Sequence, residues 1–433
     1  RPAQMDQKRL DQKLERLSAN ADRWARLSIG RRIEMLDTII DSMSEVAEPM
    51  IDHSLETKRI APGSNAEAEE WFSGPIAVLR ACRLLRESLS SIAETGHPPV
   101  SHGDVHRHPS GQAVVDILPR NGWDRALYPG FSAEVRMQPE IDAEAIGEAL
   151  GGFYRQERPE GGVELVLTVA NVASIPPLDV LTKMFIDGKV CLVQMHPVQD
   201  DFEPIMRGLF SEMFREGFLE IAFGRAETGA YLVDHDLVDE IHLTGSDQTY
   251  EAVAAAVGGE KPITSGLGNI SPIVVAPGPW SADEIEYHAE NIATQIVANA
   301  GFNCNDAQVL VTPKGWEGRE PLLEAVREQF RRIDPRFAFY KGAHERFETF
   351  TDAYEQSEQF GRRTDDVLPW ALIPDVDRAE ADSLCFSQEA FCGILCETAL
   401  PAPHPPSFLA QALDFCKDTL WGTLCASLVV HPD

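Results

Sequence analysis

Cys304 is the residue of this sequence with the most direct potential for chemistry. It lies in the run 299–305 (NAGFNCN), among small and amide residues, directly after an amphipathic helical pattern over 290–299. A cysteine acts as a nucleophile only as the thiolate, and exposed backbone amides at a turn lower the pKa of a thiol. The setting therefore predicts a nucleophilic thiolate, although a buried structural cysteine is the usual alternative for an isolated Cys.

The elements that must position this cysteine alternate along the chain. An apolar run over 163–169, a helical pattern over 177–186, an apolar run over 189–195, a helical pattern over 202–216 and a run over 219–223 follow one another. Alternating strands and helices predict a parallel sheet with crossover connections. The central part of the chain is therefore predicted to be α/β.

The first part of the chain has a different character. Between Leu10 and Met43, apolar residues recur at spacings of three, four and seven, which predicts helices with one buried face. Between Gly96 and Pro139, Pro, Gly and short alternating runs such as 112–118 indicate short strands and hairpins. We therefore expect a β-rich segment between helices.

Two glycine features follow predicted strands. Gly224 and Gly229 are separated by four residues after one strand, and Gly245 and Ser246 follow another. A turn from a strand into a helix leaves backbone N–H groups unpaired, and these could bind the pyrophosphate of a dinucleotide. The fingerprint Gly-x-Gly-x-x-Gly is absent. A pair of tight turns without a nucleotide is the alternative.

Composition excludes several classes of protein. The chain has 433 residues, which allows two or three domains at roughly 150 residues each. Its formal net charge of −31 repels phosphate backbones and anionic membranes, so neither nucleic acid nor a membrane is expected as a partner. No stretch reaches the roughly 18 uninterrupted apolar residues of a membrane helix, and the first 32 residues are charged and helical, so we predict a cytoplasmic protein. The eight cysteines lack a regular framework and are predicted to be reduced.

Three histidines near the start of the β-rich segment could bind a metal. His102, His106 and His108 lie within seven residues, a spacing that metal ligands can have. No Cys or carboxylate partner stands at a fixed offset from them. A solvated loop is therefore favoured, and no metal site is predicted.

Six motifs occur in the order and rough spacing of the aldehyde dehydrogenase superfamily. They are Asn171 after a strand, 243–246 (LTGS), 267–272 (LGNISP), 299–304 (NAGFNC), 389–393 (EAFCG) and 418–422 (DTLWG). From about Ala113 to its end, the chain therefore resembles that superfamily. The resemblance implies an α/β fold with two Rossmann-type parallel-sheet domains and a β-rich oligomerisation arm. It places an NAD(P)-binding domain at 1–265, with the bridging arm at about 123–156, and a catalytic domain at 266–433.

The resemblance also implies roles for individual residues. Cys304 matches the nucleophile that adds to an aldehyde and passes through a thiohemiacetal and a thioester. Asn171 matches the amide that stabilises the developing oxyanion, although capping of the following helix is the alternative. Glu389 matches a glutamate that binds the nicotinamide ribose, with Phe391 packing beside it. An exposed loop glutamate is the alternative for Glu389.

Two positions depart from the pattern of the superfamily. Oxidising members usually have a glutamate just before the Leu-Gly pair 267–268, and this glutamate activates the water that hydrolyses the thioester; here the position is Gly266. Many relatives have a lysine that binds the adenosine ribose where this chain has His196. A mostly neutral imidazole brings little charge for a 2′-phosphate, which favours NAD over NADP. A strand-end histidine without a ligand is the alternative.

Three hypotheses follow from Gly266. The protein is an NAD(P)-dependent aldehyde oxidoreductase whose hydrolytic step is slow or uses a base from elsewhere. Alternatively, it resembles the acylating members of the superfamily, in which coenzyme A takes the acyl group and no water-activating carboxylate is required. The third hypothesis is a catalytically impaired relative that binds nucleotide. The aldehyde itself cannot be assigned from the sequence.

The resemblance further implies a homodimer or homotetramer. Relatives continue for several tens of residues beyond the point that matches 429–432, and that tail completes the catalytic domain. We therefore expect the C-terminal part of the catalytic domain to be missing from the sequence that ends at Asp433.

Overall fold

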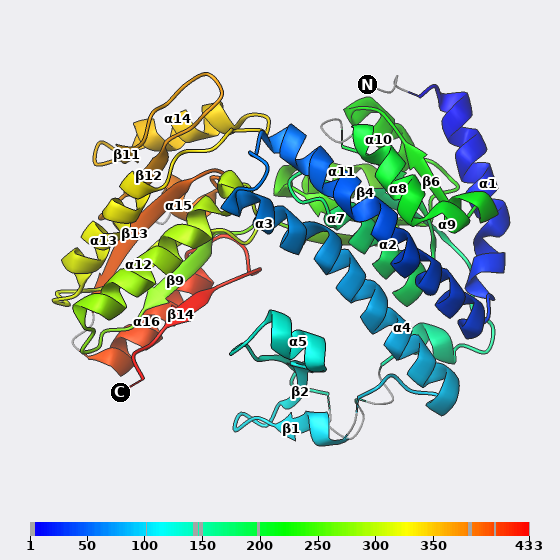
Figure 1. The fold of residues 1–433 in the computed structure, drawn as a ribbon, viewed down its shortest axis with the longest axis horizontal. Coiled ribbons are helices and arrows are strands. Elements are labelled where there is room, and N and C mark those ends of the chain that lie inside the picture. Colours follow the sequence, from blue (N-terminus) through cyan, green and yellow to red (C-terminus); the bar gives the residue numbers. More distant parts are fainter. Residues whose placement is uncertain are drawn as a thin grey trace.

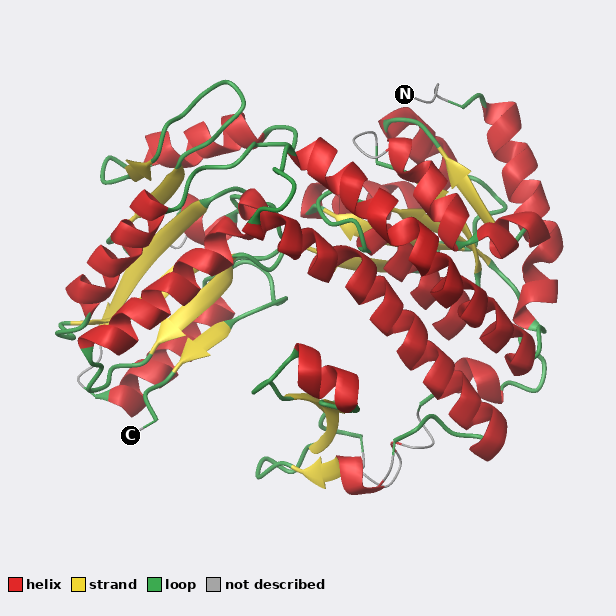
Figure 2. Ribbon diagram, viewed as in Figure 1, coloured by secondary structure: helices red, strands yellow, loops and turns green. Residues whose placement is uncertain are grey.

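Two parallel sheets form two lobes, and a third, smaller sheet lies apart from both (Figures 1 and 2). In the computed structural model, the described residues are 5–100, 102–141, 146, 150–196, 200–379, 383–401 and 404–432. The α/β fold with two parallel sheets, predicted from the sequence, is confirmed.

The first lobe is built on a five-stranded parallel sheet. In spatial order its strands are β6 (Leu219–Ala222), β5 (Val190–Gln194), β4 (Val163–Leu167), β7 (Glu240–Gly245) and β8 (Ile263–Leu267). The chain runs from β4 outward to β6 and then returns to the other side of β4 with β7. This reversal is a topological switch point between β4 and β7, where the carboxyl ends of strands form a crevice for ligands in doubly wound sheets.

Helices cover both faces of this sheet. They are α1 (Gln7–Ala25), α2 (Ile29–Lys58), α4 (Ala77–Thr95), α7 (Ile175–Leu181), α8 (Glu203–Leu209), α9 (Ser211–Glu216), α10 (Ala226–Val233) and α11 (Asp247–Val257). The predicted apolar face of the N-terminal helices is confirmed, since Leu10, Leu14 and Leu17 are buried on α1. Among the described residues, no helix has both the length and the apolar composition that crossing a membrane requires.

The second lobe is built on a six-stranded sheet. Its order is β11 (Glu358–Phe360), β12 (Trp370–Ile373), β13 (Ile394–Pro401), β10 (Ala307–Lys314), β9 (Ser271–Val275) and β14 (Ser427–Val429). All neighbours are parallel except β11 and β12. Its helices are α12 (Ala282–Val297), α13 (Arg319–Arg332), α14 (Ala343–Ala353), α15 (Leu384–Ser387) and α16 (Pro405–Asp418). The predicted domain boundary between 265 and 266 falls within β8, the last strand of the first sheet.

The short helix α3 (Asn65–Trp71) belongs to the first part of the chain but contacts the second lobe. It follows α2 and continues through a π-helical turn, η1 (Phe72–Ile76), into α4. Figure 1 shows α3 near α12 and α15 of the second lobe, whereas α4 extends along the first lobe. A segment from the first part of the chain thus reaches the second lobe.

The β-rich segment forms a small antiparallel sheet of β1 (Val105–Arg107), β2 (Ala113–Leu118) and β3 (Ala133–Arg136). All three strands lie within the β-rich stretch expected between Gly96 and Pro139, and β1 and β2 precede the start of about 123 expected for the bridging arm, which stays a prediction. The alternating run 112–118 indicated the earlier strands, but the boundary followed the resemblance and not this pattern. Helix α5 (Gly122–Leu127) lies between β2 and β3 in the chain, and Trp123 and Phe131 are 66% and 68% exposed there.

Candidate active site

Cys304 lies in a short loop between two elements of the second lobe. The 3-10 turn η6 (Ala298–Gly301) precedes the loop and β10 follows it. Within η6, Asn299 and Ala300 have φ angles of 49° and 59°, which residues other than glycine rarely adopt. The unusual backbone turns the chain between the end of α12 and Cys304, so surrounding contacts must hold it in place.

The buried side chain of Asn299 makes several of these contacts. Its Nδ2 lies 3.0 Å from the carbonyl oxygen of Asn171, 3.2 Å from that of Phe302 and 3.0 Å from Asn303 Oδ1. A primary amide has two N–H donors, so the three acceptors share them. Through these bonds the loop is attached to the segment that follows β4 in the first lobe.

A buried carboxyl group closes the turn on the other side of the loop. Asp306 Oδ2 accepts the backbone N–H of Asn303 at 3.1 Å, and its Oδ1 accepts the Asn303 side chain at 2.8 Å. Burial raises the pKa of Asp306 well above its ordinary value, although the two bonds from Asn303 oppose this shift. Both flanks of Cys304 are therefore fixed by side-chain hydrogen bonds.

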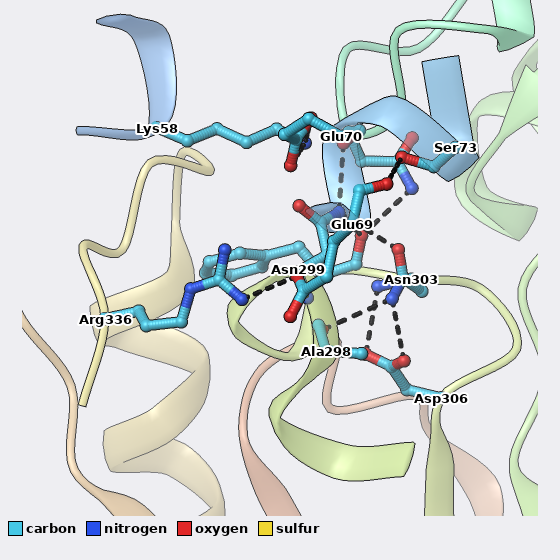
Figure 3. A network of polar contacts seen from close by, with 11 residues as sticks. Lys58, Glu69, Glu70, Ser73, Ala298, Asn299, Asn303, Asp306 and Arg336 are labelled. Carbon is cyan, nitrogen blue, oxygen red and sulfur yellow. Dashed lines mark hydrogen bonds and ion pairs between the residues drawn. The ribbon is translucent and has the colours of Figure 1, made fainter. Parts of the chain in front are cut away.

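Helix α3 adds a carboxylate to this network (Figure 3). Glu69 Oε2 accepts the backbone N–H of Asn299 at 2.9 Å, and an Arg336 N–H donates to the same oxygen at 2.7 Å. Beside it, Lys58 donates to both carboxylate oxygens of Glu70 at 2.8 Å. Three segments that are far apart in the sequence thus meet at the loop that bears Cys304.

Asn171 lies next to the Cys304 loop. It follows β4, is buried, and its Nδ2 donates to the carbonyl oxygen of Phe302 at 3.0 Å. Its Oδ1 is buried without a hydrogen-bond partner among the described residues. The amide has two N–H groups, and the bond to Phe302 uses one of them. Asn171 does not cap the helix that follows, because Ser174 is the residue before α7.

The predicted lowering of the Cys304 pKa is wrong for this structure. Burial raises the pKa of the thiol, and the charge of Glu389 raises it further. The backbone N–H of Cys304 lowers it, as the turn predicted, but by less than burial raises it. The sequence did not predict this shift because the residues that bury the thiol come from other parts of the chain.

Glu389 and Phe391 lie in the loop between α15 and β13. A Cβ added to Gly268 would lie 2.1 Å from Glu389 Oε2, so the carboxylate occupies the space beside that glycine. Phe391 has a φ of 44° and packs against Tyr340 and Phe302, with ring centroids 5.0 and 6.0 Å apart. That Glu389 binds a ribose stays a prediction.

Gly266 leaves its position open. A Cβ there would meet only Thr244, at 3.7 Å or more, so no other described side chain fills the space of the absent glutamate within 4 Å. The residue is exposed at the end of β8. The site therefore has room for a side chain at 266 but carries none.

Gly224 and Gly229 flank the start of α10 at the carboxyl edge of the first sheet. A Cβ at Gly224 would lie 1.9 Å from Thr228 Oγ1, so a larger residue there would displace the first turn of the helix. Gly229 lies beside Gln194, the last residue of β5. The buried Oε1 of Gln194 has no hydrogen-bond partner among the described residues.

Gly245 and Ser246 lie at the switch point of the same sheet. Gly245 ends β7, and a Cβ there would be 4.0 Å from Val169, which follows β4. Ser246 caps α11 and accepts the backbone N–H of Thr249 at 3.3 Å. The unpartnered Gln194 oxygen and the start of α11 at the switch point of the sheet fit a bound dinucleotide.

His196 follows β5 and faces the second lobe. Its ring stacks on Tyr340 with centroids 6.1 Å apart and an interplanar angle of 19°. Burial lowers the pKa of His196, and the charge of Lys341 lowers it further. The imidazole is therefore neutral near pH 7, as the sequence predicted.

The described side chains of His106 and His108 make separate contacts. His106 lies near Asp116 and Glu134, at 3.9 Å from each carboxylate, and all three side chains are exposed. His108 instead contacts Ser110 through Nδ1 at 2.9 Å. The side chain of His102 lies outside the described residues.

Sequence reasoning missed the residues that support the site from a distance. Glu69, Asp306, Gln308, Arg336 and Arg346 were not singled out. Asn299 and Asn303 lie inside the motif 299–304, so their amides could have been suspected. Nothing in the local sequence of α3 marks Glu69, because its role depends on a partner 230 residues away.

The fold and the site define a class of protein. It is a two-lobed α/β protein in which the loop that bears Cys304 is hydrogen-bonded to a doubly wound parallel sheet of the kind that binds dinucleotides. The profile of the aldehyde dehydrogenase family matches residues 203–336, which include Cys304. N-succinylglutamate 5-semialdehyde dehydrogenase 1 from Caulobacter vibrioides is 32% identical over 130 residues, or 28% of this chain and 26% of that protein. The chain thus aligns with about a quarter of that relative.

Solved structures resemble the whole chain. Indole-3-acetaldehyde dehydrogenase in complex with NAD+ has a TM-score of 0.71 at 14% identity, covering 99% of this chain and 78% of that one. NADP-dependent glyceraldehyde-3-phosphate dehydrogenase from Bacillus halodurans, in complex with NADP, has a TM-score of 0.66 at 13% identity, with 99% and 85% covered. The chain therefore has the fold of these aldehyde dehydrogenases, and its residues 203–336 are similar in sequence to the aldehyde dehydrogenase family.

Proposed function

We propose that this protein oxidises an aldehyde with NAD(P), using Cys304 as the nucleophile. The observation that carries the proposal is the bond from Asn171 Nδ2 to the carbonyl oxygen of Phe302 at 3.0 Å. It holds a buried amide donor beside the loop of a half-buried cysteine, at the edge of the sheet whose switch point fits a dinucleotide. A structural cysteine would not require such a donor.

The residues can carry the first half of the reaction. The Cys304 thiolate forms a C–S bond with the carbonyl carbon, and the carbonyl oxygen becomes an alkoxide. The remaining N–H of Asn171 and the backbone N–H of Cys304 are the donors for this oxygen, a contribution commonly of about 3–4 kcal/mol. Loss of hydride from the carbon then leaves a thioester on Cys304.

A bound nicotinamide would supply the acceptor for that hydride. Gly224, Gly229, Gly245 and Ser246 are the proposed contacts for the dinucleotide, with His196 toward the adenosine side and Phe391 near the nicotinamide. The neutral imidazole of His196 favours NAD, since it offers no charge for a 2′-phosphate. The Glu389 ribose contact belongs to the same proposal.

The experiment is to mix the purified protein with NAD and a panel of aliphatic, aromatic and semialdehyde compounds. NADH should form with at least one aldehyde and should be absent for Cys304→Ala. Failure of every aldehyde with both NAD and NADP, together with no Cys304-dependent labelling by an aldehyde-like electrophile, contradicts the proposal.

Gly266 favours a second candidate, acyl transfer to coenzyme A. A thiolate is already a good nucleophile, so it needs no base at position 266. In that case NADH formation stops after one equivalent per enzyme. Coenzyme A then restores turnover and a thioester product accumulates.

The remaining expectations concern organisation. We propose a cofactor-binding first domain, a catalytic second domain from about residue 266, and assembly into homodimers or homotetramers. The exposed Trp123 and Phe131 beside the small sheet support an oligomer interface there, since large exposed apolar side chains are typical of such surfaces. Sedimentation velocity of the wild-type protein and of Trp123→Ser/Phe131→Ser tests the assembly.

A further inference from the structure

The two residues that follow Glu389 are held by side chains from two elements, β10 and α14. Gln308 of β10 accepts the Ala390 N–H at 3.0 Å and donates to the carbonyl oxygen of Asn269 at 3.0 Å. Arg346 of α14 donates to the carbonyl oxygens of Ala390 and Phe391 at 3.1 and 3.2 Å. The backbone around Glu389 is thereby tied both to the segment after β8 and to the second lobe.

The carboxylate points to the space beside Gly268. All three atoms nearest to a Cβ at Gly268 belong to Glu389, at 2.1, 2.5 and 2.6 Å. Gly268 is only two residues beyond Gly266, where the usual base is absent. The carboxylate thus lies beside the residue two positions after Gly266 in the chain, although it does not come within 4 Å of a Cβ at Gly266.

One oxygen of this carboxylate is available. Oε1 is buried and has no hydrogen-bond partner among the described residues. After burial, the charge of Glu389 contributes most to raising the pKa of Cys304. A water between Oε1 and an acyl group on Cys304 would have an acceptor for its proton.

We propose that Glu389 is the general base that activates the deacylating water in place of the glutamate absent at position 266. This proposal rests on the proposed acyl-Cys304 intermediate. The water oxygen attacks the acyl carbon while its proton passes to Glu389. The C–S bond breaks, the carboxylic acid leaves, and the proton returns from Glu389 to the Cys304 sulfur.

The environment of Glu389 suits this role. Burial raises the pKa of Glu389 to about 8, and the charge of Asp247 contributes to this rise, whereas the Asn269 N–H, Arg346 and Gln308 lower it. A base with a pKa near the working pH accepts a proton more readily than an ordinary carboxylate. The other titratable groups that sense its charge are Cys304, Asp306 and Tyr340. Deacylation should accelerate as the pH rises towards about 8.

The test uses p-nitrophenyl acetate, which acylates a nucleophilic thiol without cofactor or aldehyde. A burst of p-nitrophenolate measures acylation of Cys304, and the steady rate that follows measures deacylation. Glu389→Gln should keep a burst of one equivalent while the steady rate falls about 10²- to 10⁴-fold. The p-nitrophenyl acetate assay contains no NAD, so the proposed ribose contact of Glu389 does not affect this steady rate; calorimetry with NAD measures that contact separately.

Two further variants separate the base from a structural role. Gly268→Ala should displace the flexible carboxylate and slow deacylation with the burst intact, whereas Gly30→Ala, where an added Cβ meets nothing within 4 Å, should leave the steady rate unchanged. Gly266→Glu in the Glu389→Gln background should recover at least tenfold in steady rate.

The outcomes distinguish the two proposals. If the wild-type protein shows no burst, or if the burst persists in Cys304→Ala, then Cys304 does not form an acyl-enzyme and the proposed function is wrong. If the burst stands but Glu389→Gln deacylates at the wild-type rate, only the base assignment is overturned. A large loss of NAD affinity with unchanged deacylation assigns Glu389 to the ribose alone.

Discussion

Glu69 on α3 accepts a hydrogen bond from the backbone N–H of Asn299 at 2.9 Å, although 230 residues separate them. Asn299 is in a left-handed conformation and lies five residues before Cys304. The bond therefore fixes an unfavourable backbone geometry near the proposed nucleophile. Arg336 shares the same oxygen and ties the carboxylate to the second lobe.

Replacing Glu69 should loosen this loop. Glu69→Ala leaves the Asn299 N–H without its acceptor, which should cost about 1–3 kcal/mol of unfolding free energy and reduce the acylation burst. Glu69→Gln retains an acceptor and should lose less. Urea denaturation and the p-nitrophenyl acetate burst measure both effects. Equal losses in the two variants would contradict a specific role of the Asn299 bond.

Asn171 should matter more for acylation than for binding. Asn171→Ala removes the donor to Phe302 and the proposed oxyanion donor, so the acylation rate should fall about 10²- to 10³-fold. Stopped-flow measurement of the burst gives this rate, and calorimetry with NAD gives the control. An unchanged burst rate would assign Asn171 to loop structure alone.

Alkylation of Cys304 should report its raised pKa. Because burial and Glu389 raise the pKa of the thiol, iodoacetamide should react slowly at pH 7 and increasingly fast above the ordinary thiol range near about 8.5. Glu389→Gln removes the repelling charge, so it should accelerate alkylation at pH 9. Mass spectrometry of the Cys304 peptide follows the reaction. A rate that saturates below pH 8 contradicts the structure.

The same glutamate should make stability depend on pH. The folded state retains the Glu389 proton up to about pH 8, whereas the unfolded chain releases it near about 4.3. Between these values the folded protein binds more protons, so rising pH lowers the free energy of unfolding by at most about 1.4 kcal/mol per pH unit from this group. Glu389→Gln should therefore gain stability relative to wild type between pH 5 and 8. A pH-independent difference in urea unfolding would refute this.

The buried pair of Lys58 and Glu70 should respond differently to single and double substitution. The two side chains are 5% and 1% exposed, and burial lowers the pKa of Lys58. Lys58→Met leaves the buried Glu70 charge without its partner and should lower the free energy of unfolding by about 3–5 kcal/mol. Lys58→Met/Glu70→Leu should cost markedly less. Additive losses in the double-mutant cycle would show that the pair is not coupled.

Much of the fold was predictable from local patterns. The runs at 163–169, 189–195 and 219–223 form β4, β5 and β6, and the helices at 177–186 and 202–216 lie between them. Apolar patterns identify such elements because an amphipathic helix buries one face and a central strand buries a continuous apolar run. The alternating run 112–118 also predicted β2, whereas the start of about 123 for the arm was taken from the resemblance.

The site was predictable where its residues carry motifs. Asn171 and Cys304 were singled out from the sequence, and the structure brings their segments together through Asn299 and Phe302. The supporting residues Glu69 and Arg336 were not predictable. Their partners are remote in the chain, and no local pattern records a contact made across 230 or more residues.

The sequence by itself determined the parallel α/β architecture, the cysteine loop and the absence of a side chain at Gly266. Tertiary structure alone decided the direction in which the pKa values of Cys304 and Glu389 are shifted, because burial and neighbouring charges set both values. A turn with free amides predicts a low thiol pKa, but burial and, after it, the charge of Glu389 raise the pKa of Cys304. Electrostatic environments depend on distance in space, which the order of residues does not specify.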